Sequence, residues 1–423
     1  MSTKPRAVRG MNDILPEASS TFRYLESVVQ GIVASYGYSE IRLPLLEHTE
    51  LFKRSIGEVT DIVEKEMYTF LDRNGESLTL RPEATAGMVR AGMTNGLFHN
   101  QKQKLWTSGP MFRYEKPQQG RYRQFYQFDV EAIGYEGPDV DAELIIMSAR
   151  IWQQLGISKI KLEINSLGTP EARASYRDAL IEYFTGVKNQ LDEDSIRRLE
   201  QNPLRILDSK NPGMQAIVEA APVMLDYLDE ESATHFSGLR ALLDAAGVTY
   251  IVNPRLVRGL DYYSRTVFEW VTDALGSQGA VCSGGRYDGL VQKLGGRETT
   301  AIGWAMGIER FVALYEACGG EAPTSDADVY IAALGSGTLE RAFGLAEELR
   351  DTISGIKVEM NLGGGSFKSQ MKRADKSGAE FALILGEQEL VDGCIGVKPM
   401  RSAGEQTNVA LEELAAMLEQ KLR

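Results

Sequence analysis

The segment from Arg123 to Glu131, RQFYQFDVE, alternates side chains suited to packing with side chains suited to binding. Successive side chains of a β-strand point to opposite faces. One face would carry Gln124, Tyr126, Phe128 and Val130, and the other Arg123, Phe125, Gln127, Asp129 and Glu131. A solvent-exposed sheet surface fits the second face. So does the floor of a small-ligand site, because Glu131 could accept from an N–H group and Phe125 could stack on a base.

Charged residues stand just upstream of this segment. We expect Arg113 and Glu115 on the incoming strand, and a hairpin loop over residues 116–122 that carries Lys116, Gln118 and Arg121. A guanidinium offers a fixed fork of donors to phosphate oxygens, so Arg113 is a candidate phosphate clamp. No G-x-x-x-x-G-K-[ST] motif occurs. A nucleotide would therefore be held differently from one in a P-loop protein.

Three later segments concentrate polar residues and glycines. LVRGLDYYSRTVFEW (256–270) places an arginine and two tyrosines in a short turn before a strand. SGGRYDGL (283–290) and AIGWAMGIERF (301–311) add Arg286, Arg310 and glycines that allow close approach of a ligand to the backbone. Glycine-rich loops are mostly structural, so each segment is a weak signal by itself. A hydrolase is disfavoured, because no Ser/His/Asp arrangement or H-E-x-x-H motif is visible.

The composition bounds the class of protein. A chain of 423 residues predicts two or three domains, and hydrophobic and charged fractions of 43% and 25% are typical of globular proteins. No apolar run approaches the roughly 20 residues that cross a bilayer, and the N-terminus lacks an apolar signal core. We therefore expect a cytoplasmic protein without membrane contact. The three cysteines are far apart and histidines number three, so no disulfide or metal site is predicted.

The charge leaves the question of a nucleic-acid partner open. The formal net charge is −13, but phosphate binding needs only a local basic surface. Six basic residues and one acid lie between Lys102 and Arg123, and Lys368, Lys372 and Lys376 would share one face of a helix. A solvated surface explains each cluster as well as a phosphate-binding one does.

Periodicity divides the chain into a long first domain and a short second one. We expect a helix over 19–36 stopped by Gly37, a β-rich region to about 135 with a hairpin at Asn74-Gly75, a helical insertion over about 170–245, strands over 248–307, and a helix from about 308 to 318. The polar Gly/Pro-containing segment 319–328 interrupts this pattern. The predicted domains are residues 1–320, a linker at 321–328, and a small α/β domain with a largely parallel sheet at 329–423.

Several of these segments together resemble the motifs of one enzyme family. GYSEIRLPLLE (37–47), FRYE through RYRQF (112–125) and GIERF (307–311) are similar to the three motifs of class II aminoacyl-tRNA synthetases. RGLDYYSRTVFEW (258–270) and SGGRYDGLVQKLGG (283–296) resemble the two sequence blocks of the histidyl-tRNA synthetases. The resemblance runs from RGMNDILP (9–16) to the C-terminal domain, and several long motifs in order are far more specific than any one of them.

The resemblance implies an α+β fold and an enzyme. The fold would be an antiparallel class II sheet of six or seven strands with a helical insertion, followed by an α/β anticodon-binding domain, and Pro44 would lie at the interface of a homodimer. The activity would be that of a histidine–tRNA ligase. It would use ATP, with Mg²⁺, to form histidyl-adenylate and pyrophosphate, and would then transfer histidine to the 3′ end of tRNA(His).

The same resemblance assigns roles to individual residues. Arg113 and Arg258 would be catalytic and hold the α-phosphate, and the ATP site would comprise Arg113, Glu115, Phe125 and Arg310. The histidine site would comprise Glu83, Thr85, Gln127, Glu131, Arg258, Tyr262 and Tyr263, with Glu131 and Tyr263 at the imidazole nitrogens. The tRNA acceptor end would meet Lys116, Gln118, Arg121 and Arg123. Ala84 departs from the glycine expected in bacterial relatives, which puts backbone contacts at that position in doubt.

Two other classes of protein remain as alternatives. A synthetase-like regulatory subunit of histidine biosynthesis would keep the fold without the catalysis, but such paralogues typically lack the C-terminal domain and the motif arginines, which are present here. A plain RNA-binding or dimeric scaffold protein is the second alternative. Histidine-dependent exchange of pyrophosphate into ATP would separate the enzyme from both.

Overall fold

The computed structural model describes residues 4–57, 60, 62–118, 120–207, 209, 211–258, 260, 262–276, 279–321 and 327–422. The chain forms two compact units, Met1–Ala322 and Pro323–Arg423. Five residues of the expected linker, 322–326, lie outside the described residues. Among the described residues no helix is both long and apolar enough to cross a membrane.

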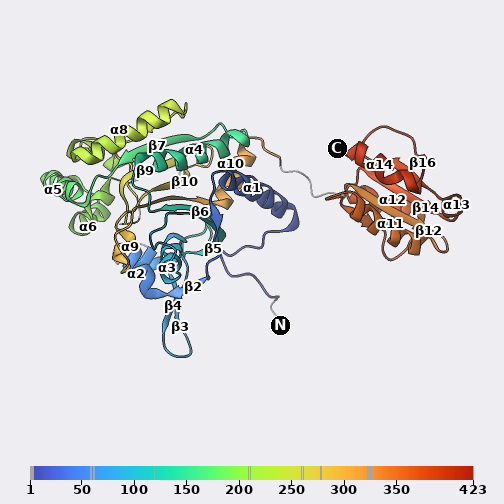
Figure 1. The fold of residues 1–423 in the computed structure, drawn as a ribbon. Coiled ribbons are helices and arrows are strands. Elements are labelled where there is room, and N and C mark those ends of the chain that lie inside the picture. Colours follow the sequence, from blue (N-terminus) through green and yellow to red (C-terminus); the bar gives the residue numbers. More distant parts are fainter. Residues whose placement is uncertain are drawn as a thin grey trace. The chain divides into compact units, whose positions relative to one another are not determined.

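The first unit is built on an eight-stranded sheet (Figure 1). In spatial order the strands are β1 (Ser39–Glu40), β5 (Gln103–Phe112), β6 (Gln124–Ile133), β11 (Ala301–Gly307), β10 (Ala280–Arg286), β9 (Ser264–Val271), β7 (Lys161–Ser166) and β8 (Ile251–Val252). The six inner strands are antiparallel, and the two-residue strands β1 and β8 pair in parallel at the edges. The expected antiparallel sheet is thus present, with two short parallel edge strands added.

Helices cover one face of this sheet and leave the other for the site. The covering helices are α1 (Pro16–Ser35), α4 (Pro138–Gln154), α8 (Glu230–Ala245) and α10 (Ile308–Ala317). Their apolar faces form one core with Phe128 and Val130 of β6, which are fully buried. The helix expected to stop at Gly37 ends at Ser35, and Gly37 has the positive φ of +81° that favours glycine there.

A small antiparallel sheet and several short helices lie beside the main sheet (Figure 1). Their bounds are β2 (Leu46–His48), β3 (Tyr68–Leu71), β4 (Ser77–Leu80), α2 (Thr49–Ile56), a π-helical turn (Ile62–Glu66), α3 (Thr85–Thr94) and α9 (Leu290–Lys293). Strands β3 and β4 form the predicted hairpin, in which Gly75 has φ +85°. Helices α2 and α3 were not predicted within this region.

The helical insertion packs on a core of its own. It contains α5 (Pro170–Gly186), α6 (Glu193–Gln201), α7 (Gln215–Glu219) and the 3-10 turns Lys188–Gln190, Pro203–Ile206, Pro212–Met214 and Met224–Tyr227. Tyr176, Leu180 and Phe184 of α5 are fully buried and pack against Ile206 and Met214. This confirms the helical prediction for 170–245, which ends with α8.

The second unit has a five-stranded sheet in the order β13 (Val358–Met360), β12 (Val329–Leu334), β14 (Phe381–Gly386), β15 (Cys394–Pro399) and β16 (Thr407–Ala410). Its helices are α11 (Thr338–Thr352), α12 (Phe367–Lys376), α13 (Glu387–Asp392) and α14 (Leu411–Leu422). Strands β13, β12 and β14 form the predicted parallel part, and the stretch after β14, predicted to resemble a β-hairpin, forms the antiparallel pair β15–β16; β15 also pairs antiparallel with β14. The short connections on either side of β15 reverse the chain and impose that direction.

The expected position of Arg113 and Glu115 on a strand is wrong. Strand β5 ends at Phe112. Beyond it the Tyr114 N–H donates to the carbonyl of Glu66 (2.7 Å) and the Glu115 N–H donates to the carbonyl of Arg113 (2.7 Å). The Arg113 N–H still donates to the carbonyl of Arg123 across the hairpin (2.9 Å), and the backbone leaves the ladder directly after it, so Glu115 projects from a loop.

Candidate active site

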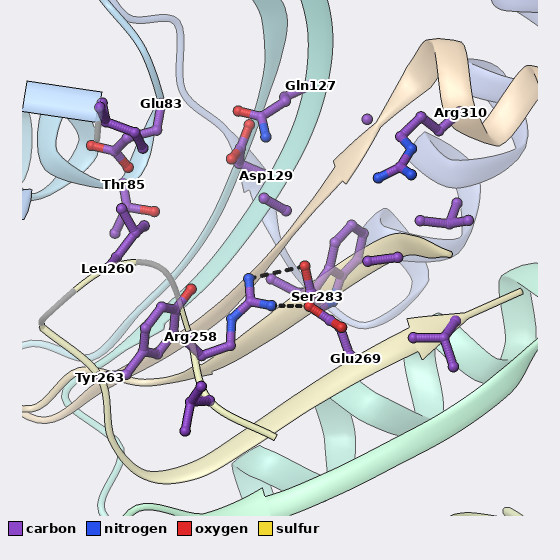
Figure 2. A pocket seen from close by; sticks show the side chains of 18 of the residues that line it. Glu83, Thr85, Gln127, Asp129, Arg258, Leu260, Tyr263, Glu269, Ser283 and Arg310 are labelled. Atoms are coloured by element: carbon purple, nitrogen blue, oxygen red, sulfur yellow. Dashed lines mark hydrogen bonds and ion pairs between the residues drawn. The ribbon is translucent and has the colours of Figure 1, made fainter. Parts of the chain in front are cut away.

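The open face of the main sheet forms the floor of a cavity of about 680 Å³. The cavity collects side chains from the sheet, from the N-terminus of α3, from the loop after β5 and from the turn before β9 (Figure 2). Its lining includes Glu83, Thr85, Arg113, Glu115, Arg121, Phe125, Gln127, Glu131, Arg258, Tyr262, Tyr263 and Arg310. Residues more than 200 positions apart in sequence therefore meet in one space.

Strand register builds a polar row across the floor. Asp129 of β6 pairs with Ala305 of β11, which pairs with Ser283 of β10. Ser283 in turn pairs with Glu269 of β9. Since paired residues point to the same face, three polar side chains and the small Ala305 lie in one line beneath the cavity.

The carboxylate of Glu131 is held at one end of the cavity. It accepts hydrogen bonds from the hydroxyls of Thr85 and Tyr287, each at 2.6 Å. Gly303, its partner on β11, must lack a side chain, because a Cβ there would lie 1.5 Å from Glu131 Oε2. Burial raises the pKa of Glu131 to about 8.

Aromatic rings and a second buried carboxylate complete this end. The rings of Tyr262 and Tyr263 lie 4.8 Å apart between centroids, and burial raises the pKa of both hydroxyls, which remain donors at neutral pH. Glu83 precedes α3 and accepts from the Ala86 N–H at 3.0 Å. Burial raises the pKa of Glu83. Ala84 has φ −102°, a conformation that needs no glycine, so the departure from the expected glycine is harmless to the backbone.

Arg258 stands in the middle of the cavity. Its guanidinium forms an ion pair with Glu269 and donates to Ser283 Oγ at 3.0 Å (Figure 2). Side chains of the neighbouring strands β9 and β10 therefore hold the Arg258 guanidinium in place. The guanidinium carbon also lies 5.4 Å from the ring centre of Tyr263, so Arg258 contacts the aromatic side chains near Glu131.

Another part of the cavity lining carries arginines and an aromatic ring. The Arg113 guanidinium lies 5.2 Å from the ring centre of Phe125, and its Nε donates to the carbonyl of Pro82 at 2.8 Å. Glu115 forms an ion pair with Arg121 at 2.8 Å. Burial, followed by the charge of Arg121, lowers the pKa of Arg310. Cations gathered in this way suit a ligand that carries several negative charges.

Comparisons with known proteins agree with this arrangement. The family model described as histidyl-tRNA synthetase matches residues 10–311, and one described as an anticodon binding domain matches residues 328–421. The chain belongs to the histidyl-tRNA synthetase family. It is 38% identical to the apo histidyl-tRNA synthetase of S. aureus, with a TM-score of 0.81 over 98% of this chain and 100% of that one.

More distant structures share the fold alone. A histidyl-tRNA synthetase from Nostoc sp. PCC 7120 is 19% identical with a TM-score of 0.74, over 99% of this chain and 100% of that one. A Bacillus halodurans protein named ATP phosphoribosyltransferase regulatory subunit/histidyl-tRNA synthetase is 22% identical with a TM-score of 0.65, over 91% of this chain and 99% of that one. The regulatory alternative is the less supported one, since Arg113, Arg258 and Arg310 all line the cavity.

Three residues of the loop predicted to meet tRNA stand outside the cavity lining, whereas Arg121 lines it. Lys116 and Gln118 are exposed. Arg123 is half-buried, with its guanidinium 3.7 Å from the ring centre of Tyr114 and its Nε donating to the carbonyl of Glu115 at 3.2 Å. Arg123 therefore stabilises the loop from within.

The sequence interpretation missed several residues of the cavity. Tyr287, Glu269 and Ser283 bind assigned residues. Tyr287 and Ser283 reach them only through the pairing of separate strands, whereas Glu269 lies 11 positions after Arg258 in the same segment. Asp129 lines the cavity beside Gln127, and its place on the polar face of β6 was the available signal. Arg286, considered for its charge, is fully buried and paired with Asp141 at 2.9 Å. It holds β10 to α4 and forms no part of the cavity lining.

Proposed function

We propose that this cavity is where the enzyme, a histidine–tRNA ligase, activates L-histidine with ATP and passes it to the 3′ end of tRNA(His). One observation carries the proposal. The buried polar side chains around Glu131, the guanidinium of Arg258 and the arginines Arg113 and Arg310 all line one cavity. A histidine bound beside Glu131 and the α-phosphate of ATP bound by Arg113 would meet at Arg258.

The Glu131 end suits the amino acid. Neutral imidazole has one donor and one acceptor nitrogen. Glu131 would accept from the ring N–H, and the Tyr263 hydroxyl would donate to the other nitrogen, with Tyr262 packed beside it. Glu83, Thr85 and Gln127 would bind the α-amino group. An amino acid without both ring nitrogens would leave buried polar groups unpaired, which supports discrimination of roughly 10⁴–10⁵.

The lining around Phe125, Arg113 and Arg310 suits ATP. The adenine would stack on Phe125 and donate through its amino group to Glu115, while Arg113 would hold the α-phosphate and Arg310 the outer phosphates. Mg²⁺ would enter on the ATP phosphates as part of the substrate. Among the described residues no group of three histidine, cysteine or acidic side chains is arranged to hold a resident metal ion.

Activation would then need positioning more than proton transfer. A carboxylate oxygen of histidine attacks the α-phosphorus, the bond to the bridging oxygen breaks, and pyrophosphate leaves. The carboxylate is already ionised at neutral pH. Arg113 and Arg258 stabilise the charge that develops on the phosphoryl oxygens.

Transfer would follow at the same place. The 3′-hydroxyl of the terminal ribose attacks the carbonyl carbon of the adenylate, loses its proton, and AMP leaves. The acceptor end would approach past Lys116, Gln118, Arg121 and Arg123. In the anticodon-binding domain, Lys368, Lys372 and Lys376 are exposed on α12, where they suit phosphate contacts.

Homodimer formation and a cytoplasmic location complete the proposal. The segment around Pro44 carries Leu45 and Leu46, which are 43% and 40% exposed, and a subunit interface would cover such side chains. The cytoplasm is where charged tRNA is consumed by translation.

The test is exchange of labelled pyrophosphate into ATP. Exchange should require both histidine and Mg²⁺, and it should be negligible with the other amino acids. Equal exchange with another amino acid would overturn the assignment of the Glu131 end.

A further inference from the structure

Three buried oxygen atoms that line the cavity have no hydrogen-bond partner within the described part of the chain. They are Glu83 Oε2, Gln127 Oε1 and Asp129 Oδ2. Gln127 and Asp129 project from the same face of β6, and Glu83 lies across the cavity from them (Figure 2). A buried acceptor without a donor costs roughly 1–3 kcal/mol. Three such acceptors around one space indicate a ligand that brings donors.

Asp129 is the member of this set without an assigned role. It is 1% exposed, and no ion pair joins it to Arg81 or Arg113, the two cations that lower its pKa, within the residues that the structure describes. Arg81 donates instead to the carbonyls of Pro110 (3.0 Å) and Leu43 (3.4 Å). A carboxylate that only supported the fold would be paired at this depth.

The carboxylates near Asp129 also favour binding of a cation. Burial, together with the carboxylates of Glu131 and Glu83, raises the pKa of Asp129 well above its usual value. These three carboxylates therefore disfavour one another's charge in the free cavity. A bound cation would relieve that repulsion.

The α-ammonium of an amino acid matches both requirements, because it carries one positive charge and three N–H donors. We propose that Asp129 is a direct ligand of the histidine α-ammonium and completes a three-oxygen cage with Glu83 and Gln127. The inference rests on the proposed function. The three oxygens would make the site select amino acids over carboxylic acids of the same shape that lack the α-ammonium group.

The test compares three ligands by isothermal titration to the full-length protein. Histidine carries both the ammonium and the carboxylate, histidinol keeps only the ammonium, and 3-(imidazol-4-yl)propionate keeps only the carboxylate. Asp129→Asn retains the shape and removes the charge. It should weaken histidine and histidinol by about 10- to 100-fold, as expected for loss of a hydrogen bond to a charged group. Binding of the propionate should change less than about threefold by the same scale.

Stability separates this role from a structural one. Because Asp129→Asn removes a charge that its neighbours disfavour, the melting temperature of the ligand-free variant should equal or exceed that of the wild type. Glu26→Gln is the matched control, since burial also raises the pKa of Glu26 but its side chain lies outside the cavity lining. This control should bind all three ligands as the wild type does.

Two outcomes would overturn the inference. Equal losses for all three ligands would mean that Asp129 shapes the whole cavity, and unchanged histidine binding would mean that it contacts no ammonium. If Asp129→Asn does not fold, Asp129→Ala must give the same selective pattern. Failure of the wild type to bind histidine would instead reject the proposed function, so the two failures are distinguishable.

Discussion

Replacing Arg258 by lysine should slow pyrophosphate exchange by about 10²–10³ in kcat while leaving the protein folded. The guanidinium is held by Glu269 on β9 and by Ser283 on β10, the latter at 3.0 Å. A lysine ammonium is a single point of charge on a flexible stem. It can stay beside Glu269 but cannot hold both partners and also face the substrate.

The expected magnitudes differ between activity and stability. The loss in rate corresponds to about 3–4 kcal/mol of transition-state stabilisation. The Arg258 and Glu269 side chains are 15% and 21% exposed, and lysine keeps the opposite charges together. The free energy of unfolding should therefore fall mainly by the lost hydrogen bond to Ser283, about 1.5–3 kcal/mol.

The assay is exchange at saturating histidine and ATP, with thermal unfolding measured in parallel. Arg286→Lys is the matched control. Arg286 is fully buried, pairs with Asp141 and Asp288, and donates to the carbonyls of Tyr135 and Gly137. That variant should lose stability and keep the turnover of its folded fraction. Near-normal turnover by folded Arg258→Lys protein would refute the proposal that the Arg258 guanidinium stabilises the charge on the phosphoryl oxygens.

Three further predictions follow from the cavity and the division into two units. Gly303→Ala should weaken histidine binding in a titration and lower the melting temperature, because the new Cβ would lie 1.5 Å from Glu131 Oε2. Burial raises the pKa of Glu131 from 4.5 to about 8, so between these values the folded state retains a proton that the unfolded chain has released. Ligand-free stability should therefore fall as the pH rises from 5 to about 8.5, and Glu131→Gln should show a smaller fall in denaturant titrations. A fragment ending near Gly320 should retain histidine-dependent exchange but charge tRNA far less efficiently, since it lacks the α12 lysines; equal losses in both reactions would contradict this.

Local patterns predicted the elements with clear periodicity. The alternation in β6 identified the polar face that became the cavity floor, and Asn74-Gly75 identified the β3–β4 hairpin. Helix α3 was missed because seven of its ten residues are buried, so TAGMVRAGMT has no broad polar face to reveal helical spacing. Its Gly92 is required by close packing, since a Cβ there would lie 1.9 Å from the ring of Phe98.

The partners within the cavity depend on pairing between distant strands. Glu269 meets Arg258 because β9 follows the turn that carries Arg258, but Ser283 reaches it only through the register of β10 against β9. Tyr287 reaches Glu131 across 156 positions of sequence. Periodicity within a segment carries no information on such register, so the contacts of Ser283 and Tyr287 could not be derived from the sequence of any one segment.

The most direct test of the whole account is a crystal structure with a non-hydrolysable histidyl-adenylate analogue. We expect the imidazole between Glu131 and Tyr263, the ammonium within the oxygens of Glu83, Gln127 and Asp129, the phosphate mimic at Arg258, and the adenine on Phe125. An analogue bound with its imidazole on Phe125, or outside this cavity, would contradict the account.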